Sequence, residues 1–296
     1  MTATEAQSGP LDRTSADTIF EFQALNDARG DRHAAERSEH DKQAGGIHDD
    51  TVAQRFGYQG ALVPGIIIAA HTMPTLVERW GKDWLKRGRI AMKHIRPAFD
   101  SETLTACYRF SSDAAGEHAE IVVLRGDVAV AVGDASLPKV VPAIPTDLSR
   151  EPLPMPAVLP LAEPEMLKPG QPLFSKPTVM DAAEHRVLLE RIGGVSGKWS
   201  YGSIHPLAYQ HLTSHDAIGS FTYSTPGIHV WGDTQMLDWA EPDETLQSSG
   251  RVTAVYERKG HHYFDTEQLV QTVGGRPIAL CRRSVIYRAR EASAAQ

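Results

Sequence analysis

Cysteine and positive charge are both scarce in this sequence. Only Cys107 and Cys281 are cysteines, and neither belongs to a Cys-x-x-Cys pair. Two isolated cysteines argue against a disulfide framework and against a thiolate metal site. The formal net charge is -7. A negatively charged chain has no general affinity for phosphate backbones or anionic lipid, so neither nucleic acid nor membrane is expected as a partner.

Long apolar segments are also missing. The longest apolar run, Ala61 to Met73, is interrupted by Pro64 and His71. It is too short to cross a bilayer and is typical of a buried helix. The residues after Met1 are polar through Asp17, with no apolar core of a secretory signal. The sequence therefore predicts a cytoplasmic protein.

Several catalytic and cofactor motifs are absent. The chain has no Gly-x-Ser-x-Gly elbow, no phosphate-binding glycine loop ending in Lys-Ser or Lys-Thr, and no dinucleotide fingerprint. His211 and His215 have the spacing of two ligands on one helix face, but no third ligand accompanies them. His261 and His262 would point to opposite faces of a strand. We therefore expect neither a metal nor a cofactor.

Proline is abundant in one segment, and this divides the chain. Nine prolines lie between Pro138 and Pro177, a density that excludes a continuous helix or a central strand. Val, Leu and Met among them predict an extended strap lying on the surface. The expected organisation is given by residue ranges: a disordered N-terminus at 1–13, a first domain at 14–140, a linker at 141–170 and a second domain at 171–290.

The first half has an α+β pattern. It begins with a short strand at Thr18 to Phe22 and irregular polar sequence to Gly46. Pro64 and Gly65 then open one apolar helix, which we expect to end near Glu78 or Arg79 with Gly81 beside its end. Four strand-like runs follow, at Ile90 to Ile95, Leu104 to Phe110, Ala119 to Leu124 and Val128 to Val132.

The second half repeats this pattern weakly, which favours an internal duplication. Strand-like runs follow at Arg251 to Tyr256, Tyr263 to Thr272 and Ile278 to Tyr287. Three short matches support the duplication: Ile204-His205-Pro206 with Ile47-His48-Asp49, Pro226-Gly227-Ile228 with Pro64-Gly65-Ile66, and Glu244-Thr245-Leu246 with Glu102-Thr103-Leu104.

The most informative stretch lies just before and within the start of the apolar helix. It reads Ile47-His48-Asp49-Asp50-Thr51-Val52-Ala53, then Gly57-Tyr58-Gln59-Gly60-Ala61-Leu62-Val63-Pro64-Gly65, with Arg96-Pro97-Ala98-Phe99-Asp100 after the helix. These segments resemble the signature of the MaoC-like (R)-specific enoyl-thioester hydratases and dehydratases. The resemblance is strong over residues 47 to 104 and faint elsewhere. It implies a double hotdog fold, in which two long central helices pack on one continuous antiparallel sheet.

The resemblance also implies a reaction site. Hydration of a double bond next to a thioester needs a group that moves a proton near neutral pH, and His48 is the candidate. The amide of Gly65 would stabilise the negative charge that develops on the thioester oxygen. The family's aspartate five residues before the histidine is replaced by Gln43. Asp41 is the first alternative and Asp49 the second; Asp50, the third, is more suited to capping the following turn.

Other residues would complete the pocket. Tyr58, Val63 and Pro64 adjoin Gly65, although an aromatic residue such as Tyr58 at a helix entrance more often packs as a core residue. In the second half His205 stands where the match places His48, without the accompanying aspartate, so that copy is expected to be degenerate. It would provide a wall of the acyl pocket through three residues: His205, Tyr209 and His229.

Several functions fit these observations. The first is a hydro-lyase that adds or removes water at an enoyl or 3-hydroxyacyl thioester of coenzyme A or an acyl carrier protein. The alternatives are an acyl thioesterase, a dehydratase or isomerase of a secondary metabolite, and a non-catalytic acyl-binding protein, because one fold supports several chemistries. A small-molecule acyl thioester is the expected partner, with a slight preference for a homodimer.

Overall fold

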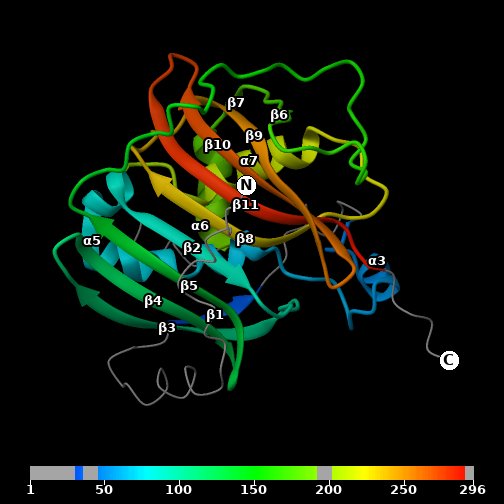
Figure 1. The fold of residues 1–296 in the computed structure, drawn as a ribbon. Helices are drawn as coiled ribbons and strands as arrows, with labels where there is room; N and C mark the ends of the chain where they lie inside the picture. The colour runs from blue at the N-terminus through cyan, green and yellow to red at the C-terminus, as the bar shows by residue number, and fades with distance from the viewer. Residues whose placement is uncertain (1–30, 36–45, 192–201, 291–296) are drawn as a thin grey trace, which may run out of the picture.

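A single antiparallel sheet organises the chain (Figure 1). The computed structural model describes residues 31–35, 46–191 and 202–290, and these residues form an 11-stranded sheet. Its order is β1-β3-β4-β5-β2-β8-β11-β10-β9-β6, with β7 paired to β9 off this path. The strands are β1 (Asp31–Ala35), β2 (Arg89–His94), β3 (Glu102–Ser112), β4 (Gly116–Arg125), β5 (Val128–Pro138), β6 (Pro172–Leu173), β7 (Thr178–Val179), β8 (Ile228–Met236), β9 (Thr245–Arg258), β10 (His261–Thr272) and β11 (Pro277–Arg288).

Each half of the sheet carries a helix. α5 packs against β5 and β8, α7 packs against β9, β10 and β11, and α4 packs against α7. Both α5 and α7 are seen behind the strands in Figure 1. No helix in the described part of the chain is long and apolar enough to span a membrane. The helices are α3 (Asp50–Arg55), α4 (Gly65–Ala70), α5 (Met73–Arg87), α6 (Ala182–Arg191) and α7 (Leu207–Gly219).

The helix predicted to open at Pro64 and Gly65 does so. Pro64 is the N-cap of α4 and Gly65 is its first residue. The helical path continues after His71 and Thr72 as α5, and it extends beyond the expected end near Arg79. Gly81 interrupts it with φ 62°, a conformation that glycine adopts without strain. A last helical turn follows Gly81 and buries two large side chains, Trp84 and Leu85.

The seven predicted strand-like runs after residue 89 all form strands of the sheet. One region was predicted wrongly, because Asp31–Ala35 forms strand β1 instead of irregular sequence. This strand pairs with β3 at the edge of the sheet through backbone hydrogen bonds, which need no apolar pattern. The strand expected at Thr18 to Phe22 lies outside the described residues.

The matches between the halves hold only in part. Glu102 begins β3 and Thr245 begins β9, and these strands occupy equivalent places in the order of the sheet. Pro226-Gly227-Ile228, however, leads into strand β8 and not into a helix. The central helix of the second half is α7, whose N-cap is Pro206. Short tripeptide matches therefore misaligned the second half, because proline and glycine open strands as readily as they open helices.

The proline-rich segment wraps around the second half. Leu148 packs against Leu269 and Leu280, and further along Leu167 joins the core beneath α7 beside Ala217. In Figure 1 this segment is the green trace that follows β5 around the outside of the second half. The strap is anchored to the strands by polar contacts as well, since Ser249 Oγ donates to the Ser149 carbonyl at 2.7 Å.

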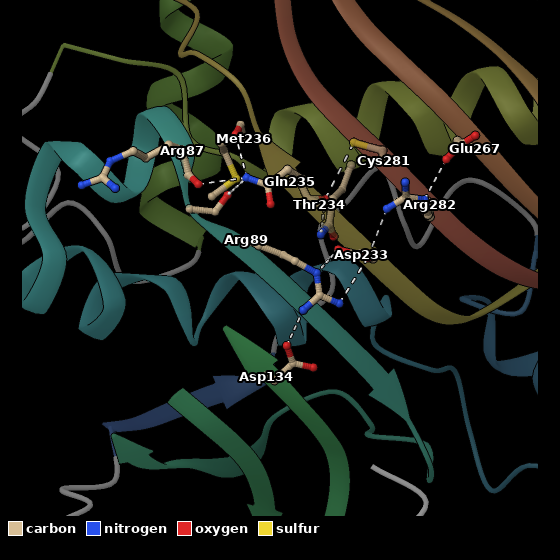
Figure 2. A network of polar contacts seen from close by, with 12 residues as sticks. Arg87, Arg89, Asp134, Asp233, Thr234, Gln235, Met236, Glu267, Cys281 and Arg282 are labelled. Carbon is tan, nitrogen blue, oxygen red and sulfur yellow. Dashed lines mark hydrogen bonds and ion pairs between the residues drawn. The ribbon is translucent and has the colours of Figure 1, made fainter. Parts of the chain in front are cut away.

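A row of alternating charges crosses the sheet where the two halves meet (Figure 2). Ala91, Asp233 and Arg282 are directly opposite one another on β2, β8 and β11. Arg89 reaches along β2 to this row, with its Nε 2.9 Å from Asp233 Oδ1, and it also pairs with Asp134 on β5. The row continues through a second set of partners: Arg282 with Glu267, Glu267 with Arg251, and Arg251 with Asp147 of the strap.

Asp233 is the buried member on which this row depends. Its side chain is 7% exposed, whereas that of Arg89 is 31% exposed. Burial raises the pKa of Asp233, and Arg89 and Arg282 oppose that shift. Two guanidinium groups on neighbouring strands compensate part of the hydration that the carboxylate loses.

Replacement of Asp233 by Ala is expected to destabilise the protein by about 3 kcal/mol, near the lower end for breaking a buried ion pair because Arg89 keeps some solvent. Urea unfolding at neutral pH measures the loss. Glu120→Ala is the matched control: it breaks the more exposed pair with Arg109 and is expected to remove less than about 1 kcal/mol. Equal losses in the two variants would contradict a special role for Asp233.

Candidate functional site

The loop that carries the His48 motif is fixed by its two aspartates. Asp49 is the N-cap of α3, and its Oδ1 accepts from the Val52 N–H at 2.9 Å. Asp50 accepts from the Ala61 N–H at 2.8 Å through Oδ1. The capping role expected for Asp50 therefore belongs to Asp49, because the residue before the first helical turn has the extended backbone that aims its side chain at the N–H groups.

His48 is held in one orientation by the chain ahead of α4. Its Nδ1–H donates to the Leu62 carbonyl oxygen at 2.7 Å. In a neutral imidazole this leaves Nε2 as the nitrogen with the lone pair, the form that a general base requires. Backbone hydrogen bonds also join these loop segments. The Leu62 N–H donates to the Ile47 carbonyl oxygen, and the Val63 N–H donates to the Ala98 carbonyl oxygen. The two segments that carry the family resemblance thus meet at Leu62 and Val63.

A small cavity of about 140 Å³ lies beside the start of α4. Tyr58, Val63, Gly65 and His229, all predicted from the sequence, line it. Leu62, whose carbonyl holds His48, lines it too. Pro64, the remaining predicted residue of this group, lines a larger cavity instead. Asp41 lies outside the described residues, so its place as partner of His48 remains a prediction.

Gly65 has a close neighbour that the sequence did not indicate. A Cβ atom at Gly65 would lie 2.5 Å from the His94 ring, so no other residue fits there without moving the imidazole. His94 stands 5.5 Å, centroid to centroid, from His229. Burial lowers the pKa of His94 to about 4. Burial, Arg283 and His94 also lower the pKa of His229. Both rings are therefore neutral at physiological pH.

Tyr58 is a partly buried wall residue. It packs in a small cluster with Ile47, Ala53 and Leu62, as expected for an aromatic residue at a helix entrance. Burial raises the pKa of its phenol, and Tyr263 of the second half adds to the shift. Tyr58 is therefore a neutral hydroxyl in the lining of the cavity.

Of the three second-half residues expected to form a wall of the acyl pocket, His229 lines the small cavity, whereas His205 and Tyr209 lie in the core. His205 is fully buried, and its Nδ1 accepts from the Leu207 N–H at 3.1 Å at the start of α7. Both histidines directly precede the N-cap of a helix, but His205 precedes the central helix α7 whereas His48 precedes the short helix α3, ahead of α4, so their places in the two halves differ. Tyr209 is a core residue whose hydroxyl accepts from the Ala240 N–H at 2.9 Å. His229 belongs to the cavity of the first half.

A larger cavity of about 800 Å³ lies between α4, α6 and α7. Its lining is mostly apolar, but Asp216 of α7 also lines it. Asp216 Oδ2 accepts from Ser175 Oγ at 2.7 Å and from Ser248 Oγ at 2.6 Å. Gln268 Nε2 in turn donates to Ser248 Oγ at 3.3 Å. Burial raises the pKa of Asp216, and the two serine hydroxyls partly offset this shift.

Arg283 is a second charged group buried under α7. It is 2% exposed, and its NH2 group donates to the Gln210 carbonyl and to Thr213 Oγ1, each at 2.7 Å. Its Nε and NH1 atoms have no hydrogen-bond partner in the described structure. Burial lowers the pKa of Arg283 to about 10. A guanidinium so enclosed projects positive potential towards the neighbouring His229.

His211 and His215 lie close together on α7, as their spacing predicted. His211 Nε2 and His215 Nε2 are 3.2 Å apart. Within the described residues, no group of three or more His, Cys, Asp or Glu side chains is placed to hold a metal ion.

Comparisons with known proteins identify the fold. No protein-family model and no curated protein sequence matches the chain. Among solved structures, a MaoC domain protein from Chloroflexus aurantiacus superposes with a TM-score of 0.60 at 12% identity, covering 88% of this chain and 95% of that chain. A Mycobacterium tuberculosis protein described as a double hotdog superposes with a TM-score of 0.58 at 14% identity, covering 90% and 97%. A MaoC-like dehydratase gives 0.54 at 12% identity, covering 81% and 88%.

These likenesses, together with the continuous antiparallel sheet, show an α+β double hotdog fold, as the sequence motif implied. At such low identity they show the fold alone. The neighbours above that are named for an activity are dehydratases, and one fold supports several chemistries. The site of this chain must therefore be argued from its own residues.

The free energy of unfolding is expected to fall as the pH is lowered from about 6.5 towards 4. His94 has a pKa of about 4 in the folded protein and about 6.5 when unfolded, so in this interval the unfolded chain binds more protons. The difference corresponds to roughly 3 kcal/mol for His94. Buried carboxyl groups with raised pKa act in the opposite direction, so the comparison must be with a variant.

Urea unfolding of the wild type and of His94→Leu at pH 7.5 and pH 5 isolates the contribution of this histidine. We expect the wild type to lose more stability than the variant between the two pH values. Parallel losses would show that His94 is not held neutral in the folded state.

Proposed function

We propose that the protein adds water to, or removes water from, an enoyl or 3-hydroxyacyl thioester carried by coenzyme A or an acyl carrier protein. One observation carries the proposal. The Gly65 amide donates no hydrogen bond within the described structure, and Gly65 lines a cavity beside the loop that orients His48. His48 does not line this cavity itself, but it is bound to the carbonyl of Leu62, which does. A backbone donor at a cavity whose wall orients an imidazole suits a reaction that builds charge on a carbonyl oxygen.

The hydration step follows from this arrangement. His48 Nε2 takes a proton from water while the water oxygen bonds to C3 of the enoyl group. The electron pair of the double bond moves towards the thioester oxygen, where the Gly65 N–H would accommodate the negative charge. A proton then returns to C2. Dehydration runs the same steps in reverse.

A carboxyl group near His48 is needed to hold water or to deliver the proton to C2. Asp49 and Asp50 each use a carboxylate oxygen to fix the backbone of the loop. Their structural engagement favours Asp41 as the acid/base partner. The loop between Asp41 and His48 contains Gly45 and Gly46, which permit the turn that would bring Asp41 back.

Replacing His48 by Ala, or Asp41 by Asn, is expected to lower turnover roughly a hundredfold or more, the scale for losing a general acid or base. Formation or loss of enoyl absorbance with crotonyl and 3-hydroxyacyl thioesters measures the rate. His118→Ala, on β4 and in contact with Asp113 rather than with either cavity, serves as the control histidine and should keep full activity. Wild-type turnover in Asp41→Asn would remove that residue from the mechanism, and wild-type turnover in His48→Ala would refute the hydro-lyase proposal.

Thioester hydrolysis is a second candidate because of the buried cluster at the large cavity. Asp216, with its pKa raised by burial, would take a proton from water as the oxygen adds to the thioester carbonyl carbon. The carbon–sulfur bond then breaks, and the thiolate takes up the proton. Ser175, Ser248 and Gln268 would hold the carboxylate in place.

Asp216→Asn separates the two candidates. If hydrolysis occurs at this cluster, the variant should release free thiol from an acyl thioester about a hundredfold more slowly, as measured with a thiol reagent, while hydration is unchanged. Ser249→Ala changes a neighbouring hydroxyl that contacts the strap instead, and it is expected to behave as the wild type. Equal thiol release by Asp216→Asn and the wild type would exclude this cluster as a hydrolytic site.

A further inference from the structure

His94 and His229 form a pair of buried imidazoles whose nitrogens are poorly partnered within the described residues. All four ring nitrogens are closed off from solvent and none makes a hydrogen bond of normal geometry within the described residues, although a weaker contact with the Trp231 backbone acts to raise the pKa of His229. Both residues line the 140 Å³ cavity at the seam between the two halves. Buried polar atoms in native proteins nearly always have a partner, so poorly partnered nitrogens at one cavity point to a polar group that binds there.

A β-bulge places the second histidine of the pair. On β8 and β11, Trp231 is opposite Ser284 and His229 is opposite Val285, so Val230 is an extra residue. Side chains alternate between the two faces of a strand, and without the extra residue His229 would point away from the helices. The bulge turns it to the helix-covered face, where His94 already lies.

The charge around the pair selects the kind of group that can bind. Arg283 faces His229 from β11, and no carboxylate contributes to the pKa of either ring. Both imidazoles are therefore neutral, and each offers one N–H donor and one nitrogen acceptor. An imidazole turns about a soft torsion, so a nitrogen can be directed into the cavity without disturbing the backbone. Neutral rings of this kind match an uncharged oxygen group.

The size of the cavity restricts the ligand further. A volume of about 140 Å³ corresponds to only a few water molecules or a short fragment of a few carbons. It is too small for a long acyl chain, for which the 800 Å³ cavity on the other side of α4 has room. The small cavity therefore suits the reacting end of a substrate.

We propose that His94 and His229 form a polar subsite that binds an uncharged oxygen substituent, a hydroxyl or keto group, close to the carbonyl end of the acyl substrate. The inference rests on the proposed function for the substrate class, an acyl thioester. It adds a specificity: acyl groups that bear such an oxygen are preferred over plain aliphatic ones. A site built to hydrogen-bond an oxygen rejects an analogue that lacks it, because the imidazoles are then left unpaired.

Binding of two matched pantetheine thioesters tests the subsite. The probes are 3-hydroxybutyryl-pantetheine and butyryl-pantetheine, which differ by one hydroxyl group, and titration calorimetry gives both dissociation constants. The wild type should bind the hydroxylated probe about tenfold more tightly or better, the scale of one hydrogen bond. His94→Leu and His229→Leu should remove most of this preference, whereas Gln at either position, which keeps a donor and an acceptor, should retain part of it.

The stability of the Leu variants separates a binding role from a structural one. Leu replaces unpaired nitrogens by apolar surface, so at pH 7.5 the urea midpoint of each variant should equal or exceed that of the wild type. A lowered midpoint together with an unchanged preference would show that the histidines support only the fold, and the proposal would be wrong.

His48→Ala distinguishes failure of the subsite from failure of the proposed reaction. This variant should lose turnover but keep a preference for the hydroxylated probe that depends on His94 and His229. If the wild type has no hydration activity but shows this preference, the reaction proposal fails and the subsite stands. If hydration occurs and both Leu variants keep the full preference, the subsite proposal fails while the reaction stands.

Discussion

The antiparallel pairing of β2 with β8 is the contact on which the rest of the molecule depends. It joins two half-sheets into one, and Asp233 stands at its centre with Arg89 from one half and Arg282 from the other. Because these charges lie on the outer face of the seam, the inner face is left for side chains that meet the helices. The register that aligns Asp233 with Ala91 therefore also brings His94 and His229 together below α4.

The two halves bury different kinds of side chain around this seam. The first half has an apolar core in which Trp84, Leu76 and Ile121 are buried, and it contains few buried polar groups. The second half divides its apolar residues into separate clusters on either side of a polar interior. Asp216 and Arg283 lie in that interior, held by serine, threonine and glutamine side chains. Polar groups in this interior take the place of apolar side chains and so reduce the hydrophobic contribution to stability. This pattern is more typical of functional sites than of stabilising cores.

Much of the fold could be predicted from the sequence because its signals are local. Pro64 and Gly65 mark a helix start, and the strands read as alternating runs between turn residues. The His48 motif led to the correct fold and to three residues that share one cavity, Tyr58, Val63 and Gly65. His229 could not be assigned to that cavity, because a bulge changes the face of a strand without leaving a pattern in the sequence. Asp216 and Arg283 were missed because their strand and helix neighbours give no sign that a charge is buried among them.

One short helix separates the two cavities and gives each a different character. Gly65 and Ile68, one turn apart, face the small cavity, whereas Pro64, Ile66 and Ile67 face the large one. The small cavity has polar histidines at its wall, whereas the large one has a mostly apolar surface with polar side chains of α6 and α7 among its lining residues. An acyl thioester has the same division, a polar reacting end and an apolar chain. Hydration beside Gly65 and hydrolysis beside Asp216 would therefore require the substrate carbonyl to lie on opposite sides of α4, so a single bound substrate cannot serve both reactions.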